Sequence, residues 1–77
     1  MIPPRDRLLP ALRYFRSVFG GWPERHAPVV FRLSGEDYQA GRFVGLTYSD
    51  HEVLAVVDTG EPLLDLVHYS KLEPDDR

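Results

Sequence analysis

Three side chains near the C-terminal end of the chain are of the types that hydrolytic enzymes use, namely Asp65, His68 and Ser70. Successive side chains of a strand point to opposite faces, so Asp65 would lie opposite to His68, whereas His68 and Ser70 would share a face. A catalytic triad needs the carboxylate to orient the imidazole beside the hydroxyl. The spacing therefore argues against a triad, and we expect His68 to be a partly exposed strand histidine and the chain to have no catalytic residues.

The nitrogen ligands that the chain offers to a metal ion are its three histidines, His26, His51 and His68, and it contains no cysteine. These histidines fall in a predicted linker, a turn and a strand, and their spacing does not bring them together beside a carboxylate. The carboxylates of the C-terminal half lie mostly in predicted turns, where solvated structural roles are common. The sequence thus predicts neither a metal site nor a cofactor.

Basic and aromatic side chains are the best candidates for binding a partner. Arg13 and Arg16 lie one turn apart on the polar face of a predicted helix. There are two interpretations: the pair binds an acidic partner or RNA, or it only keeps this face of the helix hydrated. A second group of basic and aromatic side chains could stack a nucleobase or hold a peptide. Alternatively, each of its members packs in the core or is an isolated surface residue. Its members are Tyr38, Arg42, Tyr48, His68, Tyr69 and Lys71. We predict partner or RNA binding by the arginine pair and by every member of the second group except Tyr48.

An amphipathic helix must position the arginine pair. Apolar side chains recur at helical spacing on the side opposite to the pair, and they are Leu8, Ala11, Leu12, Tyr14, Phe15, Val18 and Phe19. Asp6 is the predicted N-cap, Pro10 is tolerated because it lies in or next to the first turn, and Gly20-Gly21 ends the helix. Residues 21–28 contain two prolines and no periodicity, which predicts a linker with Trp22 tucked in as an anchor.

The remaining residues alternate as in a β-sheet. Strands are expected at residues 29–33, 38–48, 53–57, 63–69 and 71–73, with turns at 34–37 and 49–52 and a tight hairpin at 58–61. Gly41 and Gly45 would let a sharply bent sheet close on itself. The third strand is apolar on both faces, so it is central or is covered by the helix or by a neighbouring subunit.

These patterns predict a single domain at residues 1–77 that is mainly β with one N-terminal helix. The helix is expected at residues 5–20, the linker at 21–28, a small, strongly bent five-stranded antiparallel barrel at 29–73 and an acidic tail at 74–77.

The segment Pro28-Val29-Val30-Phe31-Arg32-Leu33, followed by Gly41-Arg42-Phe43, resembles the first motif of the Sm-like family. The bacterial branch of that family, which includes hexameric RNA chaperones and small Rho-binding antiterminators, places a basic helix ahead of a bent sheet. In the RNA chaperones a Tyr-Lys-His run on the fourth strand helps to bind uridine-rich RNA. The nearest segment here is Val67-His68-Tyr69-Ser70-Lys71, in which the same residue types stand in another order. The resemblance implies an Sm-like barrel and, as an alternative function, an RNA-binding regulator.

A second set of residues is similar to the plasmid-borne SH3-like dihydrofolate reductases. It consists of Ser34-Gly35, Tyr38-Gln39, Gly41 and Phe43-Val44-Gly45, with Tyr69 and Leu72-Glu73 further along. Those enzymes place a Val-Gln-Ile-Tyr strand in a shared pore to bind folate and nicotinamide. The matching stretch here is Leu66-Val67-His68-Tyr69, so Val67 replaces the glutamine. Without that amide we expect no NADPH-dependent reductase activity, and the SH3-like barrel remains the alternative topology.

Charge is distributed unevenly along the chain. Residues 1–33 contain six arginines and two acids, whereas residues 34–77 contain ten acids and three basic residues. An acidic body disfavours non-specific nucleic-acid binding, which needs a basic surface. The charge therefore favours a protein partner, with RNA as a further possibility at the basic helix.

Length and hydropathy complete the expectations. A domain of 77 residues without cysteine can bury only a limited core, and such domains often gain stability by forming homo-oligomers. The longest apolar run, at residues 53–57, is too short to span a membrane, and the N-terminus lacks the layout of a signal peptide. We therefore expect a cytoplasmic, non-enzymatic binding module without membrane contact, which self-associates and acts as a regulator or adaptor through protein contacts.

Overall fold

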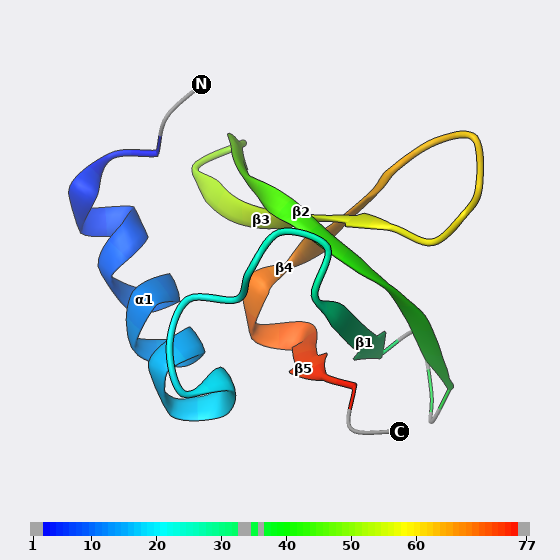
Figure 1. Ribbon diagram of the computed structural model, residues 1–77. Helices are drawn as coiled ribbons and strands as arrows, with labels where there is room; N and C mark the ends of the chain where they lie inside the picture. Colours follow the sequence, from blue (N-terminus) through cyan, green and yellow to red (C-terminus); the bar gives the residue numbers. More distant parts are fainter. Residues whose placement is uncertain (1–2, 33–34, 36, 76–77) are drawn as a thin grey trace.

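The computed structural model describes residues 3–32, 35 and 37–75. In chain order these residues form α1 (Arg5–Phe19), β1 (Pro28–Arg32), β2 (Tyr38–Ser49), β3 (Glu52–Asp58), β4 (Asp65–His68), the 3₁₀ helix η1 (Tyr69–Lys71) and β5 (Leu72–Pro74). Figure 1 shows α1 on one side of a strongly bent sheet. The predicted fold class, mainly β with one N-terminal helix, is confirmed.

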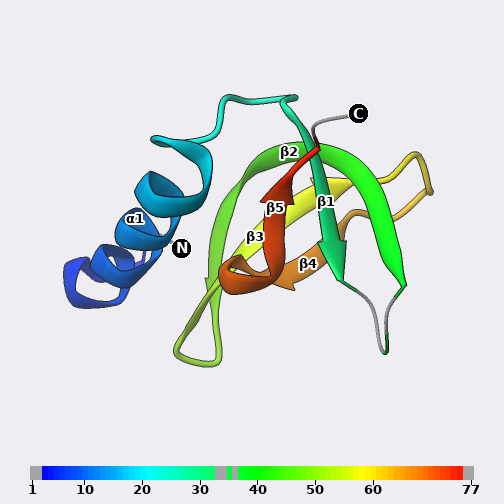
Figure 2. The same ribbon diagram turned by 90° about the horizontal axis from the view of Figure 1, so that it is seen from below.

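All five strands belong to one antiparallel sheet with the order β4-β3-β2-β1-β5. The long strand β2 connects the two halves, because its first part pairs with β1 and its second part pairs with β3. The register shifts between Phe43 and Gly45, where a bulge increases the local bend, and Figure 2 shows β2 curving over the other strands. Strands β4 and β5 end the order without pairing with each other, so the sheet is open over the residues that the structure describes.

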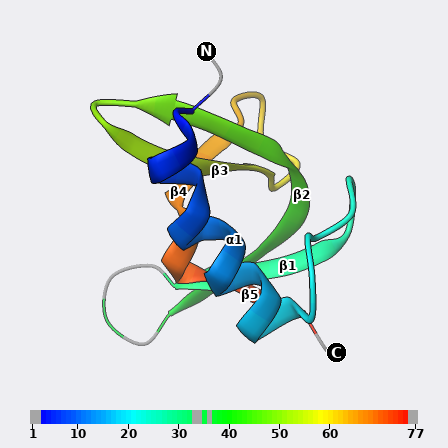
Figure 3. The same cartoon turned by 90° about the vertical axis from the view of Figure 1, so that its left-hand side faces the viewer.

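Helix α1 packs on the sheet through Ala11 and Phe15, which are both fully buried. Figure 3 shows the helix lying across the sheet. The ring of Phe15 makes edge-to-face contacts with several aromatic rings, among them Phe43 of β2 at 6.1 Å and Tyr69 of η1 at 6.3 Å. Edge-to-face pairs add stability beyond the area that they bury. Phe15 therefore joins the helix to β2 and to η1.

The ends of α1 differ in part from the prediction. The N-cap is Pro4, whose carbonyl oxygen accepts hydrogen bonds from the N–H groups of Arg7 and Leu8, whereas Asp6 lies in the first turn, so the predicted Asp6 cap is wrong. Pro10 lies in the second turn, where its missing N–H leaves one carbonyl of the first turn without its usual helical donor. Gly20 ends the helix as predicted, with a φ of 78° that favours glycine.

Two other predictions about α1 and the linker are wrong. Leu12 is 36% exposed although the periodicity placed it on the buried face, because the contact with the sheet is narrower than the apolar stripe. Trp22 is 47% exposed, so it is not tucked in, although its ring meets the edge of Phe15 with the centroids 5.5 Å apart.

A single core lies between α1 and the inner face of the sheet. Its buried members are Ala11, Phe15, Val29, Phe31, Phe43, Val53, Ala55, Val57, Val67 and Leu72. Strand β3 contributes every second residue to this core, while Leu54 and Val56 on its outer face are half-buried. The strand lies between β2 and β4, so the prediction of a central strand is confirmed.

Gly41 is required where β2 approaches the end of β3. A Cβ atom at this position would lie 2.5 Å from Val57 Cγ1 and 3.0 Å from the carbonyl oxygen of Asp58, both closer than normal contacts. A side chain at Gly45, by contrast, would meet open space. The close approach of the two strands thus depends on Gly41.

The C-terminal third differs most from the prediction. The predicted strand at 63–69 is shortened to Asp65–His68, and Tyr69 begins η1. Residues 59–64 form a wider connection in place of the predicted tight hairpin. At the start of this connection, the Gly60 N–H donates a hydrogen bond of 2.9 Å to Asp58 Oδ1. Pro74 belongs to β5 and not to a tail, because β5 pairs with β1 as far as Val29 opposite Pro74.

Some predictions fall on positions that the structure does not describe. The end of the first predicted strand at residue 33, turn residues 34 and 36, and tail residues 76–77 lie outside the described residues. Among the described residues, no helix has the length and apolar character needed to cross a membrane.

Candidate functional site

The residues predicted to bind a partner lie in three separate places. Arg13 and Arg16 are exposed on α1, Tyr38 and Arg42 lie on β2, and His68, Tyr69 and Lys71 lie at the junction of β4 and η1. The structure therefore does not combine them into one aromatic and basic surface.

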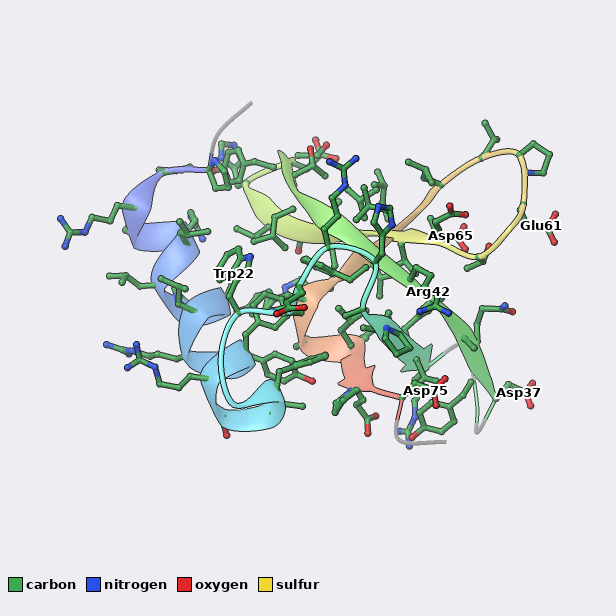
Figure 4. The ribbon with its side chains drawn as sticks, viewed as in Figure 1. Trp22, Asp37, Arg42, Glu61, Asp65 and Asp75 are labelled. Atoms are coloured by element: carbon green, nitrogen blue, oxygen red, sulfur yellow. The ribbon has the colours of Figure 1, made fainter. Side chains whose placement is uncertain are left out.

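The two residues on β2 are held by neighbours within the chain. The guanidinium of Arg32 lies 5.5 Å from the ring centroid of Tyr38, and its Nη2 donates a hydrogen bond of 3.1 Å to the Tyr38 hydroxyl. Arg42 donates from Nη1 to the carbonyl oxygen of His26 at 3.2 Å, at the side of an open cavity of about 400 Å³ whose lining includes Asp58. Figure 4 shows Arg42 on β2, away from α1. The opposite charges in this lining favour neither an anion nor a cation.

His68 and Ser70 lie together, as expected, but in an arrangement that serves the backbone. His68 Nδ1 lies 2.7 Å from Ser70 Oγ and also accepts a hydrogen bond of 3.3 Å from the Ser70 N–H. It therefore caps η1 through its side chain. Asp65 pairs with Val57, which points into the core, whereas His68 pairs with Leu54, which points to the outer face of β3. The side chains of Asp65 and His68 therefore lie on opposite faces of β4.

A groove between the start of α1, the turn after β2 and the end of β4 brings together groups that the sequence did not connect. Its volume is about 220 Å³, and its lining includes Arg7, His51, Glu52, His68 and Tyr69. The His68 ring stacks on Tyr69 with a centroid distance of 4.4 Å and an angle of 31°. No set of three or more metal-ligating side chains in the described part of the chain is arranged to hold an ion.

Tyr69 and Tyr14 connect this region to the core. Tyr14 on α1 donates its hydroxyl proton to the carbonyl oxygen of Leu72, and its ring meets Tyr69 edge to face at 5.8 Å. Burial raises the pKa of the Tyr14 phenol, and the Glu73 carboxylate raises it further. Both effects keep the phenol neutral, so Tyr14 fastens α1 to β5 as a hydrogen-bond donor.

Among the described residues, the large apolar side chains with the highest exposed fractions are leucines of the β3–β4 connection and of β4. Leu63 is 81% exposed, Leu64 is 50% exposed and Leu66 is 56% exposed. Leu66 pairs with Val56 on the outer face of the sheet, which is itself only half-buried. Strand β4 pairs with β3 alone among the described strands, so its other edge is open.

Sequence reasoning missed these leucines because it placed residues 63–69 in one alternating strand. A signal was present in the pair Leu63-Leu64, because two adjacent leucines cannot both face the core of an alternating strand. Acidic side chains flank the leucines, and Figure 4 shows Glu61 and Asp65 at the end of the molecule that is far from α1.

No protein-family model, curated protein or solved structure matches the chain in comparisons with known proteins.

Proposed function

We propose that this protein is a non-enzymatic binding module that self-associates and acts as a regulator or adaptor through protein contacts. The observation that supports this most is the group of exposed leucines, Leu63, Leu64 and Leu66, beside the open edge of β4. An unpaired edge next to exposed apolar side chains is a surface that another protein chain can cover.

The energetics favour covering this surface. Complete burial of one leucine side chain is worth roughly 1.5–3 kcal/mol, and Leu63, Leu64 and Leu66 are each at least half exposed. The half-buried Leu54 and Val56 of the outer face extend the same apolar area. A second copy of the chain is the occupant we propose, because a domain of this length gains stability when it buries more surface.

As part of this proposal, we assign the chain to the small barrels of the Sm-like or SH3-like kind. The support for this assignment is the strongly bent antiparallel sheet that follows a single helix. The helix and the bent sheet follow each other in the order that the Sm-like resemblance implies. Ring assembly and RNA binding do not follow from this order alone.

Sedimentation velocity over a range of protein concentrations tests self-association. We expect the protein to form an oligomer at micromolar concentration and the Leu64→Ser, Leu66→Ser variant to be a monomer. Tyr38→Ser is the matched control, because Tyr38 is 47% exposed but lies on β2 outside the leucine group. A strict monomer at every concentration of the unchanged protein would refute the proposal.

RNA binding is a second candidate, favoured by the groove beside α1. There the stacked rings of His68 and Tyr69 lie close to Arg7 and His51, and bases of single-stranded RNA stack on such rings. We expect salt-sensitive binding of a uridine-rich oligonucleotide. It should weaken in the Arg7→Ala variant if the RNA lies in the groove, and in the Arg13→Ala, Arg16→Ala variant if the RNA lies on the exposed side of α1. Fluorescence anisotropy at low salt measures it, and an unchanged signal at high protein concentration would end this candidate.

The proposal also includes the lack of reductase activity. Val67, at the position of the pore glutamine in the SH3-like reductases, is 8% exposed and packs in the core, so it offers no amide to a folate. The absorbance of NADPH should remain constant with dihydrofolate and a high concentration of protein. A steady decrease that depends on the protein concentration would contradict this part of the proposal.

A further inference from the structure

The exposed side of α1 carries leucines as well as the arginines of the predicted polar face. Leu9 is 41% exposed and Leu12, one turn further along, is 36% exposed, and exposed arginines lie on the same side of the helix. At about 100° per residue, these side chains fall within an arc of about 100°, and the centre of this arc lies about 130° around the helix from Ala11 and Phe15. We call this surface the arginine-leucine face, and it consists of Arg5, Leu9, Leu12, Arg13 and Arg16.

The opposite end of the molecule has the same apolar character with the opposite charge. The connection after β3 and the start of β4 combine exposed leucines with carboxylates. We call this stretch the acidic leucine segment, and it consists of Glu61, Leu63, Leu64, Asp65 and Leu66, with Asp65 and Leu66 on opposite faces at the start of β4. It contains no basic residue, whereas the arginine-leucine face has three arginines and is bordered by the exposed Asp6, one turn before Leu9.

These two surfaces cannot meet within one molecule. Figure 1 shows α1 at one end and the connection between β3 and β4 at the other, with the bent sheet between them. Figure 2 shows the same separation from a second direction. The longest dimension of the molecule is 32 Å, and the sheet lies between the two surfaces. The complementary charges therefore do not stabilise the single chain.

We propose that the arginine-leucine face of one copy binds the acidic leucine segment of a second copy. This inference rests on the proposed self-association and specifies its geometry. Because each copy contributes a different surface, the contact is heterologous, and each dimer still presents one free surface of each kind. Repetition of the contact closes into a ring or continues as a filament, according to the rotation between neighbouring copies.

The available edges favour this contact over strand pairing between copies. Strand β4 has only four residues, Asp65–His68, so its open edge offers few backbone groups for pairing with a second strand. Strand β5 offers only three residues, Leu72–Pro74, and Pro74 has no N–H group to donate. The arginine-leucine face, in contrast, offers leucines to the leucines and guanidinium groups to the carboxylates.

The interface should be modest in area and sensitive to salt. Five side chains from each copy cover less than the roughly 800 Å² per partner of a standard stable complex, so we expect a dissociation constant in the micromolar range. Reversing two arginines in contact with carboxylates should weaken association by about tenfold or more.

Two variants separate the surfaces. The helix variant carries Arg13→Glu and Arg16→Glu, and the segment variant carries Leu63→Ser and Leu66→Ser. The matched control carries Arg25→Glu and Arg32→Glu, which changes the net charge equally at exposed positions outside both surfaces. Circular dichroism of each variant confirms that the fold is retained before association is measured.

Sedimentation velocity of each variant alone and of an equimolar mixture gives the decisive result. We expect each variant alone to be a monomer, the control to associate like the unchanged protein, and the mixture to form a dimer and nothing larger. The dimer forms because the segment variant keeps its arginine-leucine face and the helix variant keeps its acidic leucine segment.

Other outcomes overturn the inference in distinguishable ways. If the helix variant associates as strongly as the unchanged protein, α1 is not part of the contact, although self-association through the leucines stands. If both variants are monomers and the mixture forms no dimer, the two surfaces do not bind each other. If the unchanged protein is itself a monomer throughout, both the inference and the proposed function fail.

Discussion

Replacement of Phe15 by alanine tests whether α1 is part of the core or only attached to it. Phe15 is fully buried, and its ring contacts aromatic rings of β2 and η1. Truncation of a buried phenylalanine costs about 3–5 kcal/mol, because the transfer free energy is lost and a cavity remains. A domain of this length has a free energy of unfolding of about 4–12 kcal/mol. The substitution should therefore remove a large part of the stability.

The measurement is urea denaturation followed by two signals. Far-ultraviolet circular dichroism reports the secondary structure, and the fluorescence of Trp22 reports the contact of its ring with Phe15, whose centroid lies 5.5 Å away. A loss of this size lowers the melting temperature of a small domain by at least about 12 °C. Ser17→Ala on the exposed side of the same helix is the control, and it should change the free energy of unfolding by less than about 0.5 kcal/mol.

A small effect of the substitution would refute the central position of Phe15 in the core. If Phe15→Ala lowers the free energy of unfolding by less than about 1 kcal/mol, the helix does not complete the core. If the two signals in the unchanged protein follow different transitions, α1 separates from the sheet before the sheet unfolds. In either case the arginine-leucine face would not be held rigidly enough to form a lasting contact.

Three further predictions follow from particular contacts. Gly41→Ala should lower the free energy of unfolding by about 1–3 kcal/mol, because its Cβ would lie 2.5 Å from Val57 Cγ1; a melting temperature equal to that of the unchanged protein would contradict this. The Tyr14 phenol has a pKa raised above 10.0 in the folded protein, so its contribution to stability is complete below pH 10 and is lost as the pH rises through the folded value. Tyr14→Phe should cost about 0.5–1.5 kcal/mol at neutral pH and reduce the decline above pH 10, as measured by urea denaturation at several pH values, and an unchanged decline would assign it to other groups. Self-association should weaken when the salt concentration rises from 50 to 500 mM, roughly as expected for exposed charge pairs; association that strengthens with salt would indicate a contact through leucines alone.

The sequence by itself determined the order and type of the elements. The helical spacing of apolar residues and the Gly20 stop located α1 to within one residue, and the unbroken apolar run from Val53 to Val57 identified the central strand. These features depend on local backbone preferences and on the spacing of apolar residues, and both can be read from residues that are close together in the sequence. The opposite positions of Asp65 and His68 on β4 followed from the rule that successive side chains of a strand point to opposite faces.

Only the tertiary structure decided which apolar residues are left exposed. The last residue of β3 to pair with β4 is Val57, opposite Asp65, so Leu63 and Leu64 have no strand to pair with and extend beyond the sheet. On α1, the narrow contact through Ala11 and Phe15 leaves Leu9 and Leu12 outside it. Burial depends on the shape and length of the neighbouring element, which no local pattern contains. For that reason the two surfaces of the proposed contact could be recognised only after the chain was folded.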